Sequence, residues 1–296
     1  MNQEFDFSID NSNLIGQFSN KEYDLNIVSN MMVNTFILDE IGYVNSKLTK
    51  TEIVLHVIND PFTLNIKKGG FKIGKMNFLI EGNYLSSKKD ILDLKIKGNQ
   101  IEISDIFSIL PIEYTNLSNQ YISKGDLNFE GHLNGELNNN KRLNFSVNFN
   151  ALNAYFKDKL NDIELNKVKL EGIFNNRKQE LKIVNFSSLI NEKILNGSFS
   201  ISNFKEPIYF FSLNGLIDLN KNIFSNYLKN VSLEGETRFK IESKIITKKG
   251  NLLFEKINGK LNSKKIVLDH KAKNTLLILN NLDLNFSKKE IFLVTK

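Results

Sequence analysis

The chain has 296 residues, of which 41% are hydrophobic and 24% charged, and its formal net charge is +6. Such a composition is typical of a folded protein with a substantial buried face and not of a disordered chain. The absence of cysteine excludes disulfides, zinc-thiolate sites and cysteine nucleophiles. Lysine supplies nearly all the positive charge, since the only arginines are Arg142, Arg177 and Arg238. Arginine forks that read bases and phosphates are scarce, so we expect no nucleic-acid partner.

The first six residues, MNQEFD, lack the basic segment followed by an apolar run that marks a secretion signal. No stretch reaches about 18 consecutive apolar residues, so no transmembrane helix is predicted. Two interpretations follow from the residues alone. The protein is cytoplasmic, or the chain is part of a longer protein whose targeting element is missing here.

A lysine- and glycine-rich stretch at residues 67–75, KKGGFKIGK, superficially resembles a phosphate-binding loop. Met76 stands where that motif needs serine or threonine, and no helical pattern follows. We predict a strand, a turn and a second strand instead.

Apolar and polar residues alternate along most of the chain, most clearly at residues 126–137, 144–150 and 231–242. Successive side chains of a strand point to opposite faces, so each segment has one apolar and one polar face. Antiparallel sheets tolerate this arrangement, whereas parallel sheets seldom do. The sequence therefore predicts an all-β protein built on antiparallel sheet.

Glycine often stands inside this alternation where an apolar residue would fall. Such glycines indicate bulges, bends or close backbone approach, which a strongly curved sheet needs. They are Gly131, Gly135, Gly197, Gly215 and Gly235. Gly250 and Gly259 fit turns better, and the asparagine-rich stretches 138–142 and 175–178 are predicted hairpin tips.

Two short amphipathic helices are predicted, at residues 104–110 before Pro111 and at residues 220–228. Each follows a strand that contains glycine, Gly98 or Gly215, and precedes another such strand. This is a weak internal repeat and argues for one elongated segment over residues 1–296, without a defensible internal boundary.

Residues that could carry out chemistry are scattered. The three histidines, His56, His132 and His270, lie far apart and lack a metal-ligand spacing, so surface positions on strands explain them. The carboxylates form no evident acid–base pair, and no Gly-x-Ser-x-Gly motif occurs. We expect a protein that is not an enzyme and has no cofactor, no metal and no catalytic residues.

Several phrases resemble the AsmA-like family of bacterial envelope proteins, which belong with the bridge-like lipid-transfer proteins. Residues 92–111, LDLKIKGNQIEISDIFSILP, are similar to a strand, KG and short-helix passage of AsmA-like proteins from the Bacteroidota, and residues 121–127, YISKGDL, continue it. Residues 69–82 and 195–204 resemble neighbouring hairpins, so the likeness spans most of the chain.

The resemblance implies an elongated, twisted antiparallel β-sheet that forms an open groove, with an inner-membrane anchor and a periplasmic location. It also implies that the groove moves phospholipid in support of outer-membrane biogenesis. Family members usually begin with an anchor, so we expect this chain to be an internal or C-terminal part of a longer protein. Protein partners are not implied.

A sheet with one apolar face and few helices needs cover for that face, and bound acyl chains would supply it. A structural or adhesive β-sandwich or solenoid with a closed, dry core is the alternative. The residues expected to line a lipid groove are Leu127, Phe129, Leu133, Phe145, Val147, Phe149, Phe199, Ile201, Phe211, Leu213, Val231, Leu233, Phe239 and Ile241.

Overall fold

The computed structural model describes residues 4–38, 41–106, 108, 119–137, 143–221, 230–248 and 250–294. The predicted hairpin tip at 138–142 lies outside these residues. So do residues 107 and 109–111 of the first predicted helix region and residues 222–228 of the second.

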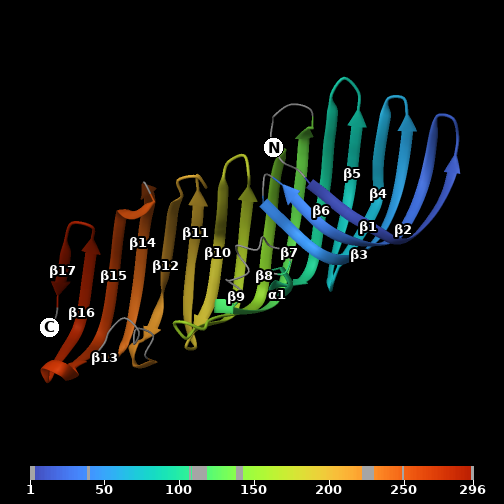
Figure 1. Ribbon diagram of the computed structural model, residues 1–296. Helices are drawn as coiled ribbons and strands as arrows, with labels where there is room; N and C mark the ends of the chain where they lie inside the picture. The colour runs from blue at the N-terminus through green and yellow to red at the C-terminus, as the bar shows by residue number, and fades with distance from the viewer. Residues whose placement is uncertain are drawn as a thin grey trace. The chain divides into compact units, whose positions relative to one another are not determined.

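The all-β prediction is confirmed. Strands hold 82% of the residues, and 17 strands form one open antiparallel sheet with almost no helix (Figure 1). By its internal contacts the chain divides into two compact units, and the division passes through β7, β8 and β9. Unit 1 comprises Met1–Asn119, Lys124–Asn150 and Phe174–Arg177. Unit 2 comprises Gln120–Ser123, Ala151–Ile173 and Lys178–Lys296.

Unit 1 is a meander in which each strand from β1 to β6 pairs antiparallel with the next strand in the chain. The phosphate-loop lookalike is a strand, a turn and a strand, as predicted, because β4 ends at Ile73 and β5 begins at Met76. The elements of this unit are β1 (Glu4–Phe18), β2 (Glu22–Leu38), β3 (Ile41–Asn59), β4 (Phe62–Ile73), β5 (Met76–Ser86), β6 (Asp90–Glu102), α1 (Ile103–Ile106), most of β7 (Tyr121–Glu136) and the first half of β8 (Asn144–Asp158).

Unit 2 continues the antiparallel pattern. The predicted hairpin tip at residues 175–178, where the chain passes from unit 1 to unit 2, is confirmed, since β9 ends at Asn175 and β10 begins at Glu180. The elements of unit 2 are the rest of β8, most of β9 (Ile163–Asn175), β10 (Glu180–Ile190), β11 (Lys193–Ser202), β12 (Ile208–Asp218), the 3-10 turn η1 (Leu219–Lys221), β13 (Val231–Glu234), β14 (Glu236–Lys248), β15 (Asn251–His270), the 3-10 turn η2 (Lys271–Lys273), β16 (Thr275–Ser287) and β17 (Ile291–Val294).

The segment 231–242, predicted as one strand, is two strands. β13 pairs with residues 267–270 of β15, whereas β14 pairs with residues 251–263. Gly235 separates β13 from β14 with a φ of +124°, a conformation that residues with a Cβ rarely adopt. Both strands run antiparallel to β15, and the pairing register shifts by one residue at Gly235.

The glycines inside the strands serve two purposes, bends and close approach to a neighbouring strand, and the sequence predicted both. Gly135 and Gly235 have positive φ and fit the predicted bends. Gly131, Gly197 and Gly215 instead lie beneath side chains of the neighbouring strand. The prediction of turns is right for Gly250, which precedes β15, and wrong for Gly259.

Gly259 lies within β15, under the ring of Phe286. Each of the two predicted repeats has the same pairing of a glycine with a phenylalanine on the next strand of the sheet. Gly98 faces Phe129 of β7, and Gly215 faces Phe239 of β14. An aromatic ring lying over a cross-strand glycine keeps apolar surface in contact where the glycine itself offers no side chain.

Replacing Gly82 by alanine is expected to destabilise unit 1 by roughly 1–3 kcal/mol or more, because strained backbone conformations cost this much. Gly82 has a φ of +140°, and a Cβ there would lie 2.1 Å from the carbonyl oxygen of Asp93. Gly70→Ala is the control, since a Cβ at Gly70 would meet nothing closer than 3.9 Å. Urea unfolding followed by circular dichroism measures both, and equal losses of stability would contradict the account.

Candidate functional site: the apolar face of each unit

The apolar side chains of unit 1 align in rows that cross its strands, and we call this surface the unit 1 face. Antiparallel pairing brings the residues of one row onto the same side of the sheet. One row is Ile27, Ile53, Gly69, Ile80, Ile96 and Gly131, and the next is Leu25, Leu55, Ile66, Gly82, Leu94 and Leu133. The period-two pattern of six separate strands thus becomes one continuous apolar surface.

Unit 2 has an equivalent surface, the unit 2 face, which extends from β11 to β17. One row is Leu195, Gly215, Phe239, Leu261, Leu284 and Leu293, and the next is Gly197, Leu213, Ile241, Gly259, Phe286 and Ile291. Both rows contain glycine among the large apolar residues, and side chains of Leu213, Phe239 and Phe286 lie over the glycines beside them.

Six of the predicted lining residues belong to unit 1. Leu127, Phe129 and Leu133 of β7 face Ile101, Gly98 and Leu94 across the β6–β7 ladder. Phe145 and Val147 of β8 would lie 3.4 Å and 3.7 Å from a Cβ at Gly131, so they share its face. Phe149 continues the same alternation along β8.

Eight predicted lining residues belong to unit 2. Phe199 pairs with Phe211, and Leu213 pairs with Ile241, so these four lie together on the unit 2 face. Phe239 belongs to the first row of that face, and Ile201 faces Tyr209, two positions beyond Phe199 on β11.

Val231 and Leu233 are not brought into these rows. They lie on β13, where their cross-strand partners are His270 and Leu268 of β15. Sequence alternation alone had placed them with Phe239 and Ile241, and the backbone change at Gly235 separates them.

Both faces remain partly open to solvent. Of the 14 predicted lining residues, Phe239 is buried at 7% exposure and the other 13 are half-buried. A fully packed core would bury most of these side chains, as happens to the cluster of Ile73, Met76, Phe78 and Ile101.

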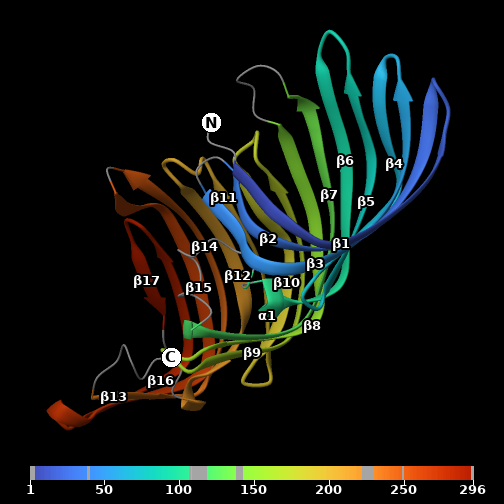
Figure 2. The same cartoon turned by 45° about the vertical axis from the view of Figure 1, so that its right-hand side comes forward.

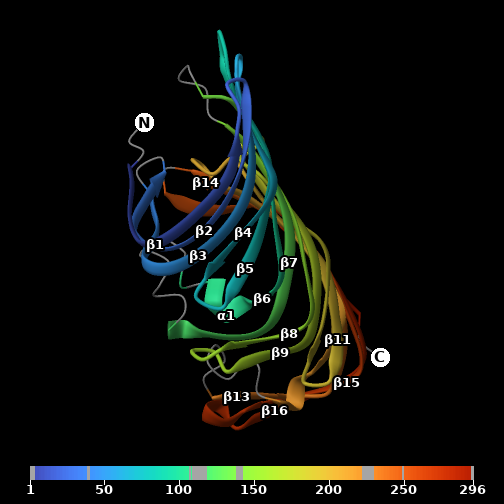
Figure 3. The same ribbon diagram turned by 90° about the vertical axis from the view of Figure 1, so that its right-hand side faces the viewer.

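That cluster lies at the end of the unit 1 face and includes the contact of a helix with the sheet. Ile106 of α1 packs against the cluster together with Phe71 and Phe129. Figure 3 shows α1 on the inner side of the bend of the unit 1 strands, and Figure 2 shows the same bend from another direction. The sequence predicted a longer helix at residues 104–110 and gave no indication that this segment would pack on this face.

Charged side chains gather on the opposite, polar faces, where they form cross-strand ion pairs. In unit 1, Asp24 accepts a hydrogen bond from the Lys67 ammonium at 2.9 Å and lies 2.9 Å from the His56 ring nitrogen Nδ1. The hydrogen bond from Lys67, followed by that from His56, holds the pKa of Asp24 below its usual value. In unit 2, the hydrogen bond that the Lys193 ammonium donates to Glu236 raises the pKa of Lys193.

The histidines are placed as the sequence predicted, on strands. His56 neighbours Asp24, and His132 Nε2 lies 2.7 Å from Asp93 Oδ1 across the β6–β7 ladder. Among the described residues, no group of three or more histidine, aspartate or glutamate side chains could hold a metal ion.

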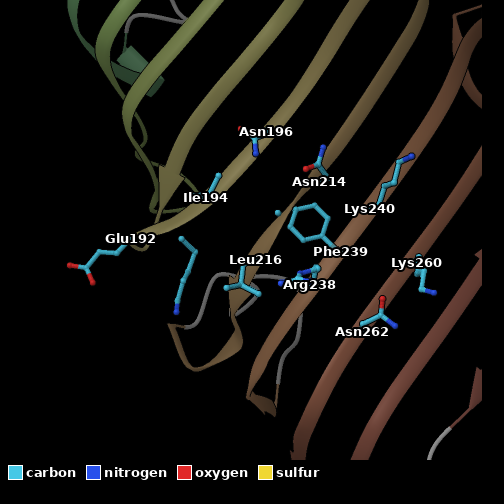
Figure 4. Close-up of a pocket in the computed structure, with 12 residues that line it drawn as sticks. Glu192, Ile194, Asn196, Asn214, Leu216, Arg238, Phe239, Lys240, Lys260 and Asn262 are labelled. Atoms are coloured by element: carbon cyan, nitrogen blue, oxygen red, sulfur yellow. The ribbon is translucent and has the colours of Figure 1, made fainter.

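A shallow hollow of about 700 Å³ lies on unit 2 and was not predicted (Figure 4). It is lined mainly by polar-face residues, among them Asn196, Asn214, Arg238, Lys240 and Lys260. Three of its lysines pair with carboxylates: Lys193 with Glu236, Lys240 with Glu242 and Lys260 with Asp283. The hollow therefore carries little net charge and has no partners arranged for one ligand.

Comparison of the chain with protein-family models, curated proteins and solved structures finds no match. Within the part of the chain that the structure describes, no helix has the length and apolar character needed to cross a membrane.

Proposed function

We propose that this chain is a non-enzymatic lipid-binding segment that holds phospholipid acyl chains against the apolar faces of its sheet. One observation carries the proposal. Rows of leucine, isoleucine and phenylalanine, with glycines among them, cross the neighbouring strands of each unit, and 13 of the 14 predicted lining residues remain partly exposed. All 17 strands belong to one sheet, so the described strands supply no separate sheet to cover these rows.

The energetic argument is direct. Removing apolar surface from water is worth roughly 25 cal/mol per Å², so leaving hundreds of Å² wet is unfavourable. Soluble proteins rarely expose contiguous apolar patches of that size, and those that do use them for binding. Acyl chains are flexible and apolar, so they can fill the space between rows of unequal side chains while their headgroups stay in water.

The resemblance to AsmA-like proteins supports the same function. It further supports placement in the periplasm with an inner-membrane anchor in the full-length protein, and a role in phospholipid movement for outer-membrane biogenesis. The residues that carry it include Gly98, which lies on the unit 1 face opposite Phe129. No ligand headgroup site is part of the proposal, because the apolar rows distinguish lipids by chain length.

The proposal is tested by extracting purified protein with organic solvent and identifying phospholipid by mass spectrometry. We expect co-purified phospholipid, and binding of fluorescent fatty acyl probes that strengthens with chain length. Each buried CH₂ contributes about 0.8 kcal/mol, so two more carbons raise affinity by about an order of magnitude.

Headgroup changes at constant chain length serve as the control and are expected to alter affinity much less. Protein that contains no phospholipid and binds no acyl probe would contradict the proposal. A core closed to polarity-sensitive dyes would instead favour the structural β-sandwich or solenoid.

A further inference from the structure

The polar face of unit 1 carries a row of lysine and asparagine residues that crosses four neighbouring strands, β2 to β5. The pairing register places Asn30, Lys50, Lys72 and Asn77 side by side in this row. All four residues are exposed. Each is the immediate chain neighbour of a residue on the apolar side, so the row points away from the unit 1 face.

The two lysines of this row lie directly opposite each other, Lys50 on β3 and Lys72 on β4. Like charges in that position destabilise a sheet. Farther along the same face a lysine opposes a carboxylate, since Lys97 pairs with Glu130 at 3.2 Å. The opposed lysines are therefore an unfavourable arrangement, and an anion bound between them would relieve their repulsion.

A third ammonium group lies close by, because Lys75 is in the turn between β4 and β5. In the part of the chain that the structure describes, no carboxylate lies within ion-pair distance of Lys50, Lys72 or Lys75. Glu52, the acidic residue of β3, is in the next row and faces Gly70. Three lysines against one glutamate leave this region with a net charge of +2.

Large apolar side chains lie among these lysines on the same face. Leu48 is two residues before Lys50 on β3 and is 62% exposed, and Leu79 is two residues after Asn77 on β5 and is 51% exposed. Val28 of β2, in the same row as Leu79, is 36% exposed. Acyl chains held on the unit 1 face would leave all three side chains in water.

Charge and apolar surface together distinguish the possible ligands. A free phosphate ion would use the ammonium groups and leave the leucines and the valine wet. The surface of a bilayer with anionic lipid offers phosphate oxygens to the lysines and the edge of the acyl region to the apolar side chains. Lysine suits such a surface, because its flexible stem brings a point charge to headgroups at varied positions.

We propose that this basic and apolar patch docks unit 1 on the surface of a bilayer that contains anionic phospholipid. The patch lies on strands that each have a paired strand on both sides, so no sheet edge takes part. Docking goes beyond the holding of acyl chains and does not depend on it, because it uses the opposite face of the sheet. The patch consists of Val28, Leu48, Lys50, Lys72, Lys75 and Leu79.

The test is co-sedimentation of the full chain with phosphatidylcholine vesicles that contain or lack phosphatidylglycerol. We expect binding that requires phosphatidylglycerol and weakens with added salt. Lys50→Gln and Lys72→Gln are each expected to weaken binding roughly fivefold, the factor that one lysine contributes near an anionic surface. Leu48→Ser should weaken binding as well, because it removes apolar surface from the contact.

Two further variants separate docking from effects on net charge and folding. Lys89→Gln removes the same charge beyond the other end of β5, where Lys89 pairs with Glu136 at 3.4 Å, and should leave vesicle affinity nearly unchanged. Lys72→Glu places a carboxylate opposite Lys50, so the sheet gains a cross-strand ion pair. Its midpoint of urea unfolding should stay equal or rise while vesicle binding is lost.

Four outcomes would overturn the proposal. The chain could bind neither kind of vesicle, or bind both equally. The lysine variants could bind as the unaltered chain does. Lys89→Gln could weaken binding as much as Lys72→Gln does, which indicates a response to net charge alone. Inorganic phosphate could displace the vesicles while Leu48→Ser binds normally, which indicates a site for a free anion.

Discussion

Leu213→Glu is expected to reduce the phospholipid that co-purifies with the protein by roughly tenfold or more, because every 1.4 kcal/mol of lost binding is tenfold. Leu213 lies on β12 in the second row of the unit 2 face, between Gly197 of β11 and Ile241 of β14. A carboxylate there would have to be desolvated beneath an acyl chain without a partner, which costs several kcal/mol. Mass spectrometry of extracted lipid, normalised to protein, measures the loss.

Asn214→Glu is the matched control for this prediction. Asn214 is the next residue of β12, lies on the opposite face and pairs with Lys240, so the same new charge meets an ammonium group there. Lipid content should stay near that of the unaltered chain. Equal loss in both variants would show that charge on β12 disturbs folding or solubility and that the unit 2 face is not the binding surface.

Ile101→Ala is expected to destabilise unit 1 by about 2–5 kcal/mol, the usual cost of removing a large aliphatic side chain from a packed core. Ile101 is 2% exposed and packs with Ile73, Met76 and Phe78, beneath the contact with α1. The midpoint of urea unfolding, followed by circular dichroism, should fall accordingly. Amide hydrogen exchange should show the loss in β6 and its neighbours.

Leu79→Ala is the control for this second prediction. Leu79 neighbours Phe78 on β5 and is 51% exposed on the other side of the sheet. Its truncation should change stability by no more than about 0.5 kcal/mol, as surface substitutions usually do. A similar loss in both variants would mean that the cluster under α1 is not the packed centre of unit 1.

These two predictions separate surfaces with different tasks. The cluster around Ile101 is buried and stabilises unit 1, whereas Leu213 is half-buried on a face that we propose binds lipid. Two results together would establish that distinction. Ile101→Ala should lower stability without a large effect on lipid content, and Leu213→Glu should lower lipid content without a large effect on stability.

The alternation of apolar and polar residues was enough to predict the strands and their faces, because side-chain direction in a strand depends only on local backbone geometry. Phe145, Val147, Phe199 and Phe211 therefore lie on the faces that the sequence predicted. The hairpin turn at 175–178 and the strand–turn–strand at 67–75 could also be predicted, because turn residues interrupt the alternation there.

Tertiary structure decided which residues meet across strands. Register is set by turns and bulges outside any one strand, so sequence could not show that Phe286 lies over Gly259 or that α1 packs at Ile106. The positive φ at Gly235 moved Val231 and Leu233 away from Phe239, against their alternation. Local periodicity determines the side of a strand that a residue faces, and long-range pairing determines its neighbours there.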